Sequence, residues 1–317
     1  MPKLSILVPC CNVEKFIDEC LLSIKNQTLE DIEIICINDG SKDTTLEILK
    51  KYASADRRIK IIDKQNTGYG DSMNIGLEQC TGEYIGIVES DDFVEPTMFE
   101  KLYNIAQKNN LDIARTGYFF YENNIDTPQK TEYIPKNKVL VPINFQKIFL
   151  QSPSIWASIY NREWLNSYKI RFLPTPGASY QDTSFSFKTY LKCRRFMMLD
   201  EYLLHYRQHP GSSINSTGKV FCVCDEWDEI IRYTKKDNHD FNKTKQLIQQ
   251  LRYQTYKWNY KRLSGKSREE FLLRWSEDLK KEQIIGLPKA QKIKLRLQQF
   301  ILKNVPSLYH LTTKNKN

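Results

Sequence analysis

The sequence predicts an α/β protein with a doubly wound, mainly parallel sheet, followed by a smaller helical domain. Apolar runs rich in β-branched residues alternate with helical patterns over residues 1–118. Such alternation is typical of a parallel sheet with helices on both faces. The last third has helical patterns only and is strongly basic. We therefore expect a first domain over 1–218, with halves at about 1–118 and 119–218, and a basic helical domain over 219–317.

The first half shows strand and helix signals in regular order. Strands are expected at 4–8, 32–38, 59–62, 83–88 and 112–117, and helices at 14–26, 43–54, 70–80 and 96–109. The run 83–88 holds four to five consecutive apolar residues. Such a run indicates a buried central strand of a parallel sheet.

The second half and the C-terminal third have different patterns. Residues 119–150 lose the regular period and carry Asn, Pro and Lys, so we expect an excursion over the surface. Residues 209–218 have the composition of a flexible loop. Strands are expected at 152–160 and within 195–207, and helices at 180–192, 219–236, 241–263, 266–284 and 288–303.

Length and composition are those of an ordinary globular protein. The 317 residues are 40% hydrophobic, and no apolar run approaches the roughly 18 residues that span a bilayer. The chain enters its first strand at Leu4 without the long apolar region of a secretory signal. The eight cysteines form no CxxC pair, so reduced core thiols are expected rather than disulfides or zinc ligands. We therefore expect a cytoplasmic protein.

The positive charge is concentrated in the last third. Residues 216–317 carry 22 Lys and Arg against 11 Asp and Glu, whereas the preceding residues carry 25 against 27. A near-neutral first domain is not expected to bind nucleic acid. In the helix predicted at 288–303, one face carries Ile293, Leu297, Phe300 and Ile301, with basic residues mostly around it. This helix could lie on an anionic membrane surface or pack on the first domain.

Three carboxylates follow the buried strand 83–88, namely Glu89, Asp91 and Asp92. Ligands of open α/β sheets bind outside the carboxyl ends of the strands. Glu89 and Asp91 are two residues apart, so both could contact one hard divalent cation, which takes oxygen ligands and bridges to phosphates. The alternative is a solvated turn in which Asp92 or Glu95 caps the next helix.

Polar residues also follow the first three strands. The first strand ends without the glycines of a dinucleotide-binding turn, which argues against a Rossmann dehydrogenase. Asp39, at the end of the second strand, could accept hydrogen bonds from a nucleobase or a ribose, or form a simple Asx turn. The stretch Lys64–Gly70, followed by Asn74, places a glycine-containing loop at a helix N-terminus, which suits a phosphate or a sugar.

Four ordered motifs together resemble glycosyltransferase family 2, and the resemblance covers roughly residues 3–215. The motifs are SILVPCCNVEKFI at 5–17, Asn38–Thr45, Asn66–Leu77 and Gly82–Asp92. The resemblance implies a GT-A fold and Mn²⁺ or Mg²⁺ held by Glu89 and Asp91. Glu89 replaces the usual first Asp of D-x-D and reaches one methylene farther, and Cys11 replaces the usual Tyr.

The resemblance also implies roles in the second half. Gln181-Asp182 opens a helix where the family typically carries Glu-Asp, which implies that Asp182 is the general base; the alternative is a helix N-cap. His205–Ser213 resembles the family's YRxHxGS, which implies that Arg207 pairs with the leaving diphosphate and that His209 contacts phosphate or acceptor. The other implied contacts to the nucleotide sugar are Pro9, Cys11, Glu14, Asp39, Asn66, Gly68, Asn74 and Ser90. Trp156 could stack on a sugar or fill the core.

The resemblance implies an inverting, metal-dependent enzyme that moves a sugar from a nucleotide-sugar donor, first of all a UDP-sugar. The acceptor would be a hydroxyl of a glycan or lipid-linked glycan in bacterial surface polysaccharide or lipooligosaccharide assembly. If 288–303 binds lipid, the enzyme would be peripheral on the inner face of the cytoplasmic membrane. Two rivals stay open: a nucleotidyltransferase of related fold, and a non-catalytic protein that binds sugar or nucleic acid.

Overall fold

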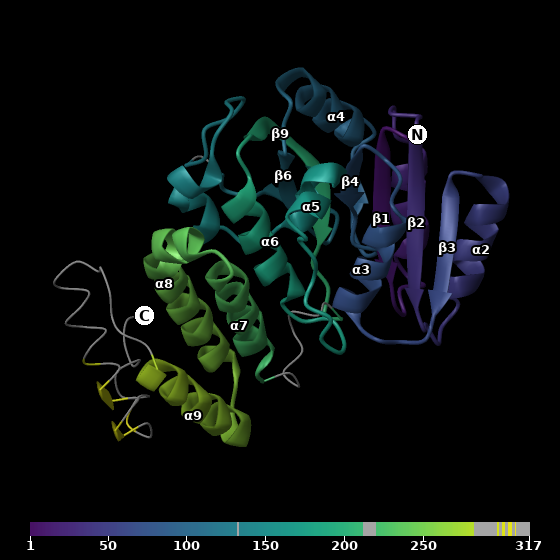
Figure 1. Ribbon diagram of the computed structural model, residues 1–317. Helices are drawn as coiled ribbons and strands as arrows, with labels where there is room; N and C mark the ends of the chain where they lie inside the picture. The colour runs from purple at the N-terminus through teal and green to yellow at the C-terminus, as the bar shows by residue number, and fades with distance from the viewer. Residues whose placement is uncertain are drawn as a thin grey trace. The chain divides into compact units, whose positions relative to one another are not determined.

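The structure, a computed structural model, describes residues 1–131, 133–211 and 220–281 and a few single positions between 297 and 308 (Figure 1). The chain divides into two compact units, Met1–Asn215 and Ser216–Asn317. The predicted loop at 209–218 and the predicted helix at 288–303 lie largely outside the described residues.

The described residues of the first unit form a nine-stranded sheet in the order β3-β2-β1-β4-β8-β6-β9-β5, with β7 paired to β6. Figure 1 shows β3, β2, β1 and β4 side by side in this order. The strands are β1 (Leu4–Cys10), β2 (Ile32–Asp39), β3 (Ile59–Lys64), β4 (Tyr84–Ile87), β5 (Phe93–Val94), β6 (Ile113–Glu122), β7 (Ile125–Pro128), β8 (Ser158–Asn161) and β9 (Phe196–Arg207).

The carboxyl ends of six strands, β1, β2, β3, β4, β6 and β9, lie at one edge of the sheet. β1 pairs in parallel with β2 and β4, and β6 pairs in parallel with β9. β8 runs antiparallel to both β4 and β6, so β6 points the same way as β4. The segments after β1, β2, β4 and β9 therefore start from the same edge, which we call the site edge. The predicted α/β fold class is confirmed, and β8 makes the sheet mixed.

Helices cover the sheet of the first unit. They are α1 (Ile17–Lys25), α2 (Thr45–Ala55), α3 (Tyr69–Gln79), α4 (Met98–Asn109), α5 (Arg162–Ser167) and α6 (Gln181–Lys192). α3 packs on β1 and β2, α2 on β3, and α4 on β6. Every residue of β1 is buried, as expected for an apolar strand in the middle of a covered parallel sheet.

The structure differs from the predicted elements mainly in the second half. The surface excursion expected at 119–150 contains a β-hairpin, in which β6 and β7 are joined by Asn123 and Asn124. Both asparagines have positive φ, 51° and 61°, as a two-residue primed turn requires. The strand expected at 152–160 is limited to β8, because a 3-10 turn at Ile155–Ala157 precedes it.

The second unit is helical where it is described. α7 (Cys222–Lys235), α8 (Asn238–Arg262) and α9 (Gly265–Lys281) pack in sequence around buried aromatic side chains, including Tyr256 and Trp275. No helix among the described residues is long and apolar enough to cross a membrane. Within the predicted helix at 288–303, Leu297 and Phe300 are helical, and their exposed fractions are 59% and 61%.

Glu33 of β2 ties the strands together at the edge opposite the site edge. Its Oε1 accepts hydrogen bonds from Ser5 Oγ at 2.5 Å, from Thr81 N at 2.7 Å and from Gly82 N at 3.2 Å. Its Oε2 accepts from Lys60 Nζ at 2.7 Å. Burial alone would raise the pKa of Glu33, but the hydrogen bonds from Lys60, Ser5 and Thr81 outweigh it and lower the pKa to about 2. The charged carboxylate therefore stabilises the fold.

We predict that Glu33→Gln lowers the free energy of unfolding at pH 7 by on the order of 3 kcal/mol, because a pKa lowered from 4.5 to about 2 favours the folded state by about 1.4 kcal/mol per unit. This stabilisation is present above the unfolded pKa and is lost as the pH falls through the folded pKa. Urea unfolding at several pH values measures the difference between the two proteins, which should shrink from pH 5 towards pH 2. Lys60→Gln is the control, and it should cost less because the Lys60 side chain is 58% exposed. A difference that does not change with pH would contradict the role of the Glu33 charge.

Candidate functional site

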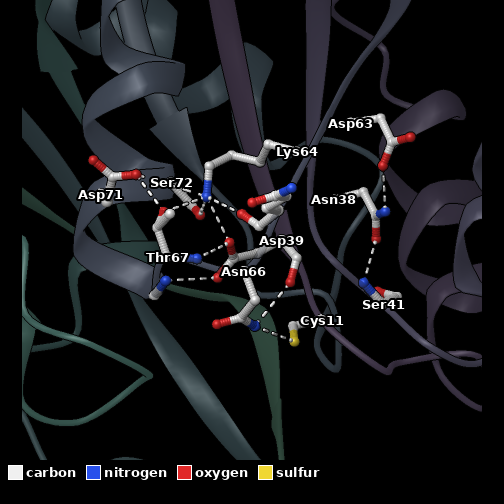
Figure 2. Close-up of polar contacts among 12 residues, drawn as sticks. Cys11, Asn38, Asp39, Ser41, Asp63, Lys64, Asn66, Thr67, Asp71 and Ser72 are labelled. Atoms are coloured by element: carbon white, nitrogen blue, oxygen red, sulfur yellow. Dashed lines mark hydrogen bonds and ion pairs between the residues drawn. The ribbon is translucent and has the colours of Figure 1, made fainter.

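Asp39, at the end of β2, holds the loop 64–68 (Figure 2). Its Oδ1 accepts from Lys64 Nζ at 2.6 Å and from Thr67 N at 2.9 Å, and its Oδ2 accepts from Gly68 N at 3.0 Å. Burial would raise the pKa of Asp39, but these hydrogen bonds, from Lys64 first, lower it. Since a carboxylate offers about four lone-pair sites, three internal partners leave little capacity for the nucleoside contact predicted from the sequence.

The loop 64–68 is bound to the ends of β1 and β2. Asn66 Nδ2 donates to the Asp39 carbonyl at 2.8 Å and lies 3.4 Å from the Sγ of Cys11 (Figure 2). Gly40 has a φ of +64°, and a Cβ there would lie 2.7 Å from Asn66 N, so glycine is needed at this position. Cys11 is exposed. The three segments thus form one surface at the site edge, which we call the donor surface.

Several residues predicted to contact the donor instead bind the chain itself. Glu14 Oε2 accepts from Thr44 N at 3.0 Å and Thr44 Oγ1 at 2.7 Å, before α2 begins. Both atoms of the Asn74 side-chain amide pair with the backbone of Phe172, at 2.8 and 3.0 Å. Pro9 and Ser90 are buried. These positions shape the site edge rather than present free side chains.

Two glycines allow the start of α3 to touch the segment before α6. A Cβ on Gly68, which has a φ of +103°, would lie 2.5 Å from Gly177 N. A Cβ on Gly70 would lie 2.0 Å from Leu173 O. Between the two glycines, Tyr69 N donates to Gly177 O at 3.0 Å. This contact fixes the two halves of the first unit to each other.

Three carboxylates gather beside this contact. The Tyr69 hydroxyl donates to Glu89 Oε1 at 2.7 Å, and Asp91 Oδ2 lies 3.0 Å from His209 Nε2. Burial is the main cause that raises the pKa of Glu89 to about 8; the Tyr69 hydrogen bond lowers this pKa, and the negative charges of Asp91 and Asp182 raise it. Glu89, Asp91 and Asp182, predicted separately, therefore share one electrostatic environment.

The carboxylates fit a divalent cation that shares its coordination with a ligand. Among the described residues, no group of three or more His, Cys, Asp or Glu could hold a metal by itself. Glu89 and Asp91 nevertheless supply the oxygen atoms that Mn²⁺ and Mg²⁺ prefer. Burial, and to a smaller degree the charges of Asp91 and Asp182, disfavour the charged form of Glu89, and a bound cation would favour that form.

Asp92 serves the fold in a different way. It is 1% exposed, and its Oδ1 accepts from Arg207 N at 2.9 Å. Its buried Oδ2 has no hydrogen-bond partner within the described part of the chain. Burial, and then the charge of Asp91, raise the pKa of Asp92 well above its usual range. Asp92 thus joins the end of β9 to the segment after β4 and does not cap a helix.

Asp182 is the second residue of α6. The N-cap is Tyr180, in a left-handed conformation with φ 65° and without a side-chain cap bond, so the N-cap alternative for Asp182 is wrong. Gln181 is held by its own loop, because its Oε1 accepts from Ser179 N at 2.6 Å and its Nε2 donates to Thr175 Oγ1 at 2.9 Å. Burial raises the pKa of Asp182 to about 7. A carboxylate with such a pKa can take up a proton near neutral pH.

Arg207 and His209 lie next to Asp91. Arg207 Nε donates to the Asp91 carbonyl at 2.9 Å, and its guanidinium pairs with Glu19. The guanidinium also lies over the rings of Phe16, Phe93 and Tyr121, at 4.9 to 5.4 Å. The pairing of Arg207 with a diphosphate, predicted from the sequence, would therefore compete with Glu19.

Tyr69 and Tyr206 were not predicted from the sequence as site residues. Tyr69 stands between two glycines in the motif Asn66–Leu77. The two flanking glycines could have indicated that the backbone at Tyr69 lies close to another segment. Tyr206 directly precedes Arg207 in β9, and its ring stacks on Trp156 with centroids 5.0 Å apart. Trp156 is 8% exposed, so its indole packs against a protein ring.

The match to the Glycosyl transferase family 2 model covers residues 5–168. The uncharacterized glycosyltransferase EpsJ of Bacillus subtilis is 36% identical over 222 residues, which are 67% of this chain and 63% of EpsJ. The alignment thus spans less than two thirds of that relative.

Two solved structures share the fold. The crystal structure of S. aureus TarS 1-349 in complex with UDP-GlcNAc has a TM-score of 0.75 and 20% identity, and covers 99% of this chain and 93% of that one. The mannosyltransferase PcManGT from Pyrobaculum calidifontis in complex with GDP-Man and Mn²⁺ has a TM-score of 0.52 and 14% identity, and covers 97% and 83%. The GT-A-like fold predicted from the sequence is confirmed. Because the family match runs through the strand ends that carry Asp39, Glu89 and Asp91, the chain belongs to glycosyl transferase family 2.

Proposed function

We propose that the chain transfers a sugar from a nucleotide-sugar donor to a hydroxyl of a glycan or lipid-linked glycan. The observation that carries this proposal is the electrostatic coupling of Glu89 to Asp91 and Asp182 at the site edge. The family match supports the reaction class, and UDP-GlcNAc in TarS makes UDP-sugars the first donors to test. The GDP-Man of PcManGT adds GDP-sugars to the same screen.

The donor surface supports binding of the nucleotide. Exposed Cys11, together with Gly40 and Asn66, lies where the ends of β1 and β2 meet the loop 64–68. Arg207 would exchange Glu19 for the diphosphate of the donor, because guanidinium pairs well with phosphate oxygens. His209 would lie on the same side, through its contact with Asp91.

We infer that Mn²⁺ or Mg²⁺ is the cofactor, and that Asp91 and Glu89 would hold it. When bound, the cation would offset the negative charge of the departing nucleoside diphosphate. The Tyr69 hydroxyl, 2.7 Å from Glu89 Oε1, orients the carboxylate that replaces the family's usual Asp. The Mn²⁺ in the PcManGT structure supports this choice of metal.

Asp182 would act as the base of a single displacement. Its carboxylate takes the proton of the acceptor hydroxyl while the acceptor oxygen forms a bond to the anomeric carbon. The bond from that carbon to the diphosphate breaks on the opposite face, so the configuration inverts. The half-buried position of Asp182 and its pKa of about 7 suit this role, because a carboxylate with this pKa can lose its proton near neutral pH and then take one up from the acceptor hydroxyl.

The rival functions have less support. A nucleotidyltransferase would need a glycine-rich loop with Lys or Arg after the first strand to grip a triphosphate, and Pro9–Lys15 lacks one. A non-catalytic sugar- or nucleic-acid-binding protein has no use for a half-buried carboxylate such as Asp182 beside Glu89. Release of UDP or GDP from a nucleotide sugar separates the proposed enzyme from both.

The C-terminal residues support a role at a membrane. Leu297 and Phe300 are helical and largely exposed, and the surrounding sequence is rich in Lys and Arg. An apolar helical face with a basic rim is suited to anionic lipid. We propose that this segment holds the enzyme on the inner face of the cytoplasmic membrane, where lipid-linked acceptors for surface polysaccharide or lipooligosaccharide would be available.

Asp91→Ala is expected to abolish metal-dependent release of UDP from a UDP-sugar, because it removes one of the two carboxylates that would hold the cation. Calorimetry should also show that Mn²⁺ no longer strengthens UDP binding. Asp31→Ala, an exposed carboxylate before β2 at the opposite edge, is the matched control and should behave like the unchanged protein. Full turnover in the presence of EDTA would contradict the metal assignment.

Asp182→Asn is expected to lower turnover by roughly 10²–10⁴-fold, because the amide keeps the shape of the carboxylate but cannot accept the proton. UDP affinity should stay nearly the same, since the nucleotide lies on the donor surface. Steady-state kinetics and UDP calorimetry measure the two effects. Normal turnover in a folded Asn variant would remove Asp182 from the mechanism.

The pH dependence checks the same assignment. The base works only when deprotonated, so turnover should rise as the pH increases through about 7, the pKa of Asp182. The residual activity of Asp182→Asn should lack this step. A rate that is constant between pH 5 and pH 9 would contradict a base with a raised pKa.

Binding to vesicles tests the membrane proposal. The intact protein should bind vesicles that contain anionic lipid and dissociate as salt rises, because salt screens each Lys and Arg contact. Replacing Lys289, Lys292, Lys294 and Arg296 with Gln should weaken binding by on the order of 1 kcal/mol per charge at most. Hydrolysis of a soluble donor is the control and should not change. Equal binding to neutral and anionic vesicles would contradict the electrostatic part of the proposal.

A further inference from the structure

Four aromatic rings gather where β6 and β9 reach the site edge. Trp156 and Tyr206 are stacked, with centroids 5.0 Å apart and ring planes at 11°. Tyr118 packs edge-on against Trp156 at 4.4 Å. Phe120 is the partner of Tyr206 in the β6–β9 register, and their centroids are 6.2 Å apart. We call these four rings the aromatic cluster.

The aromatic cluster runs from the core to the surface. Trp156 and Tyr118 are buried, Tyr206 is half-buried, and Phe120 is 38% exposed. Within the described ranges, the Tyr206 hydroxyl forms no hydrogen bond. This hydroxyl is also not completely buried. Tyr206 therefore has a rigid indole behind its ring and a hydroxyl free to bind a ligand.

Tyr206 lies near the carboxylates of the site, and the turn that carries its partner Trp156 packs on α6, the helix that carries Asp182. The next residue, Arg207, donates its backbone N–H to Asp92 Oδ1 at 2.9 Å. Burial raises the pKa of Tyr206, and the negative charges of all four carboxylates of the site, including Asp182, raise it further. The phenol thus lies within the electrostatic field of the groups at which the chemistry would occur.

The sheet order separates the aromatic cluster from the donor surface. The donor surface uses the ends of β1 and β2, whereas the cluster uses β6, β9 and the turn before β8. Glu89 and Asp91 follow β4, which lies between the two groups in the sheet. A molecule on the cluster would therefore approach the carboxylates from the side opposite to the nucleotide.

We propose that Tyr206, backed by Trp156, is a platform on which a pyranose ring of the acceptor stacks next to Asp182. The C–H face of a pyranose is apolar and packs on an aromatic ring, while the Tyr206 hydroxyl can bond to a sugar hydroxyl. This inference rests on the proposed function and makes it more specific, since the acceptor then ends in a sugar rather than in a bare lipid alcohol.

Saturation-transfer NMR with the methyl glycosides of glucose, galactose and N-acetylglucosamine tests the platform in the presence of UDP and the diamagnetic cation Mg²⁺. The wild-type protein should transfer saturation to the ring C–H protons of at least one glycoside. Tyr206→Ala should weaken this binding about tenfold or more, and Tyr206→Phe, which keeps the ring, by less. Tyr52→Ala, on α2 outside the site, is the control for loss of a tyrosine and should bind like the wild type.

Calorimetry of UDP binding to the same proteins separates the possible outcomes. Unchanged UDP affinity in Tyr206→Ala, together with lost glycoside binding, supports the acceptor platform. Loss of UDP affinity in that variant would make Tyr206 part of the donor site and overturn the proposal. Glycoside binding equal in Tyr206→Ala and wild type, or absent from a wild type that binds UDP, would also overturn it. A wild type that binds no UDP and hydrolyses no nucleotide sugar would contradict the proposed function itself.

Discussion

The close approach of two backbone segments, 68–70 and 172–177, determines the geometry of the whole site. Side chains at Gly68 and Gly70 would collide with backbone atoms of the opposite segment, so only glycine permits the contact. Tyr69, between them, bonds to Gly177 through its backbone and to Glu89 through its hydroxyl. The same contact holds the segment that leads into α6 and Asp182. A site made from both halves of the first unit therefore depends on a contact that carries no catalytic group.

The pKa values of acidic groups are shifted in opposite directions at the two edges of the sheet. At one edge, hydrogen bonds to Glu33 outweigh its burial and lower its pKa to about 2. At the site edge, burial raises the pKa of Glu89 to about 8 and that of Asp182 to about 7. The first arrangement stabilises the fold. The second arrangement leaves the carboxylates of the site edge without enough hydrogen bonds or positive charges to stabilise their charged form. Such carboxylates bind a cation or a proton more strongly than ordinary ones.

The sequence predicted the elements that repeat a simple pattern, and missed those that depend on contacts between distant residues. Buried strands such as β1 and β4 were recognised because they are continuous apolar runs. The hairpin at Asn123 and Asn124 was missed, although two consecutive asparagines are a turn signal. Motif positions indicated candidate residues at the ends of the strands, but they did not reveal that Glu14 and Asn74 bind backbone groups of the chain. The pairing of Tyr69 with Glu89 likewise joins residues that are 20 positions apart.

The most direct test of the central claim, a single displacement with Asp182 as base, is the anomeric configuration of the product. A UDP- or GDP-sugar that the protein turns over should be followed by ¹H NMR at early times, before the released sugar can mutarotate. An α-linked donor should give a β product, because water or acceptor attacks from the face opposite the diphosphate. A product with the configuration of the donor would contradict the account.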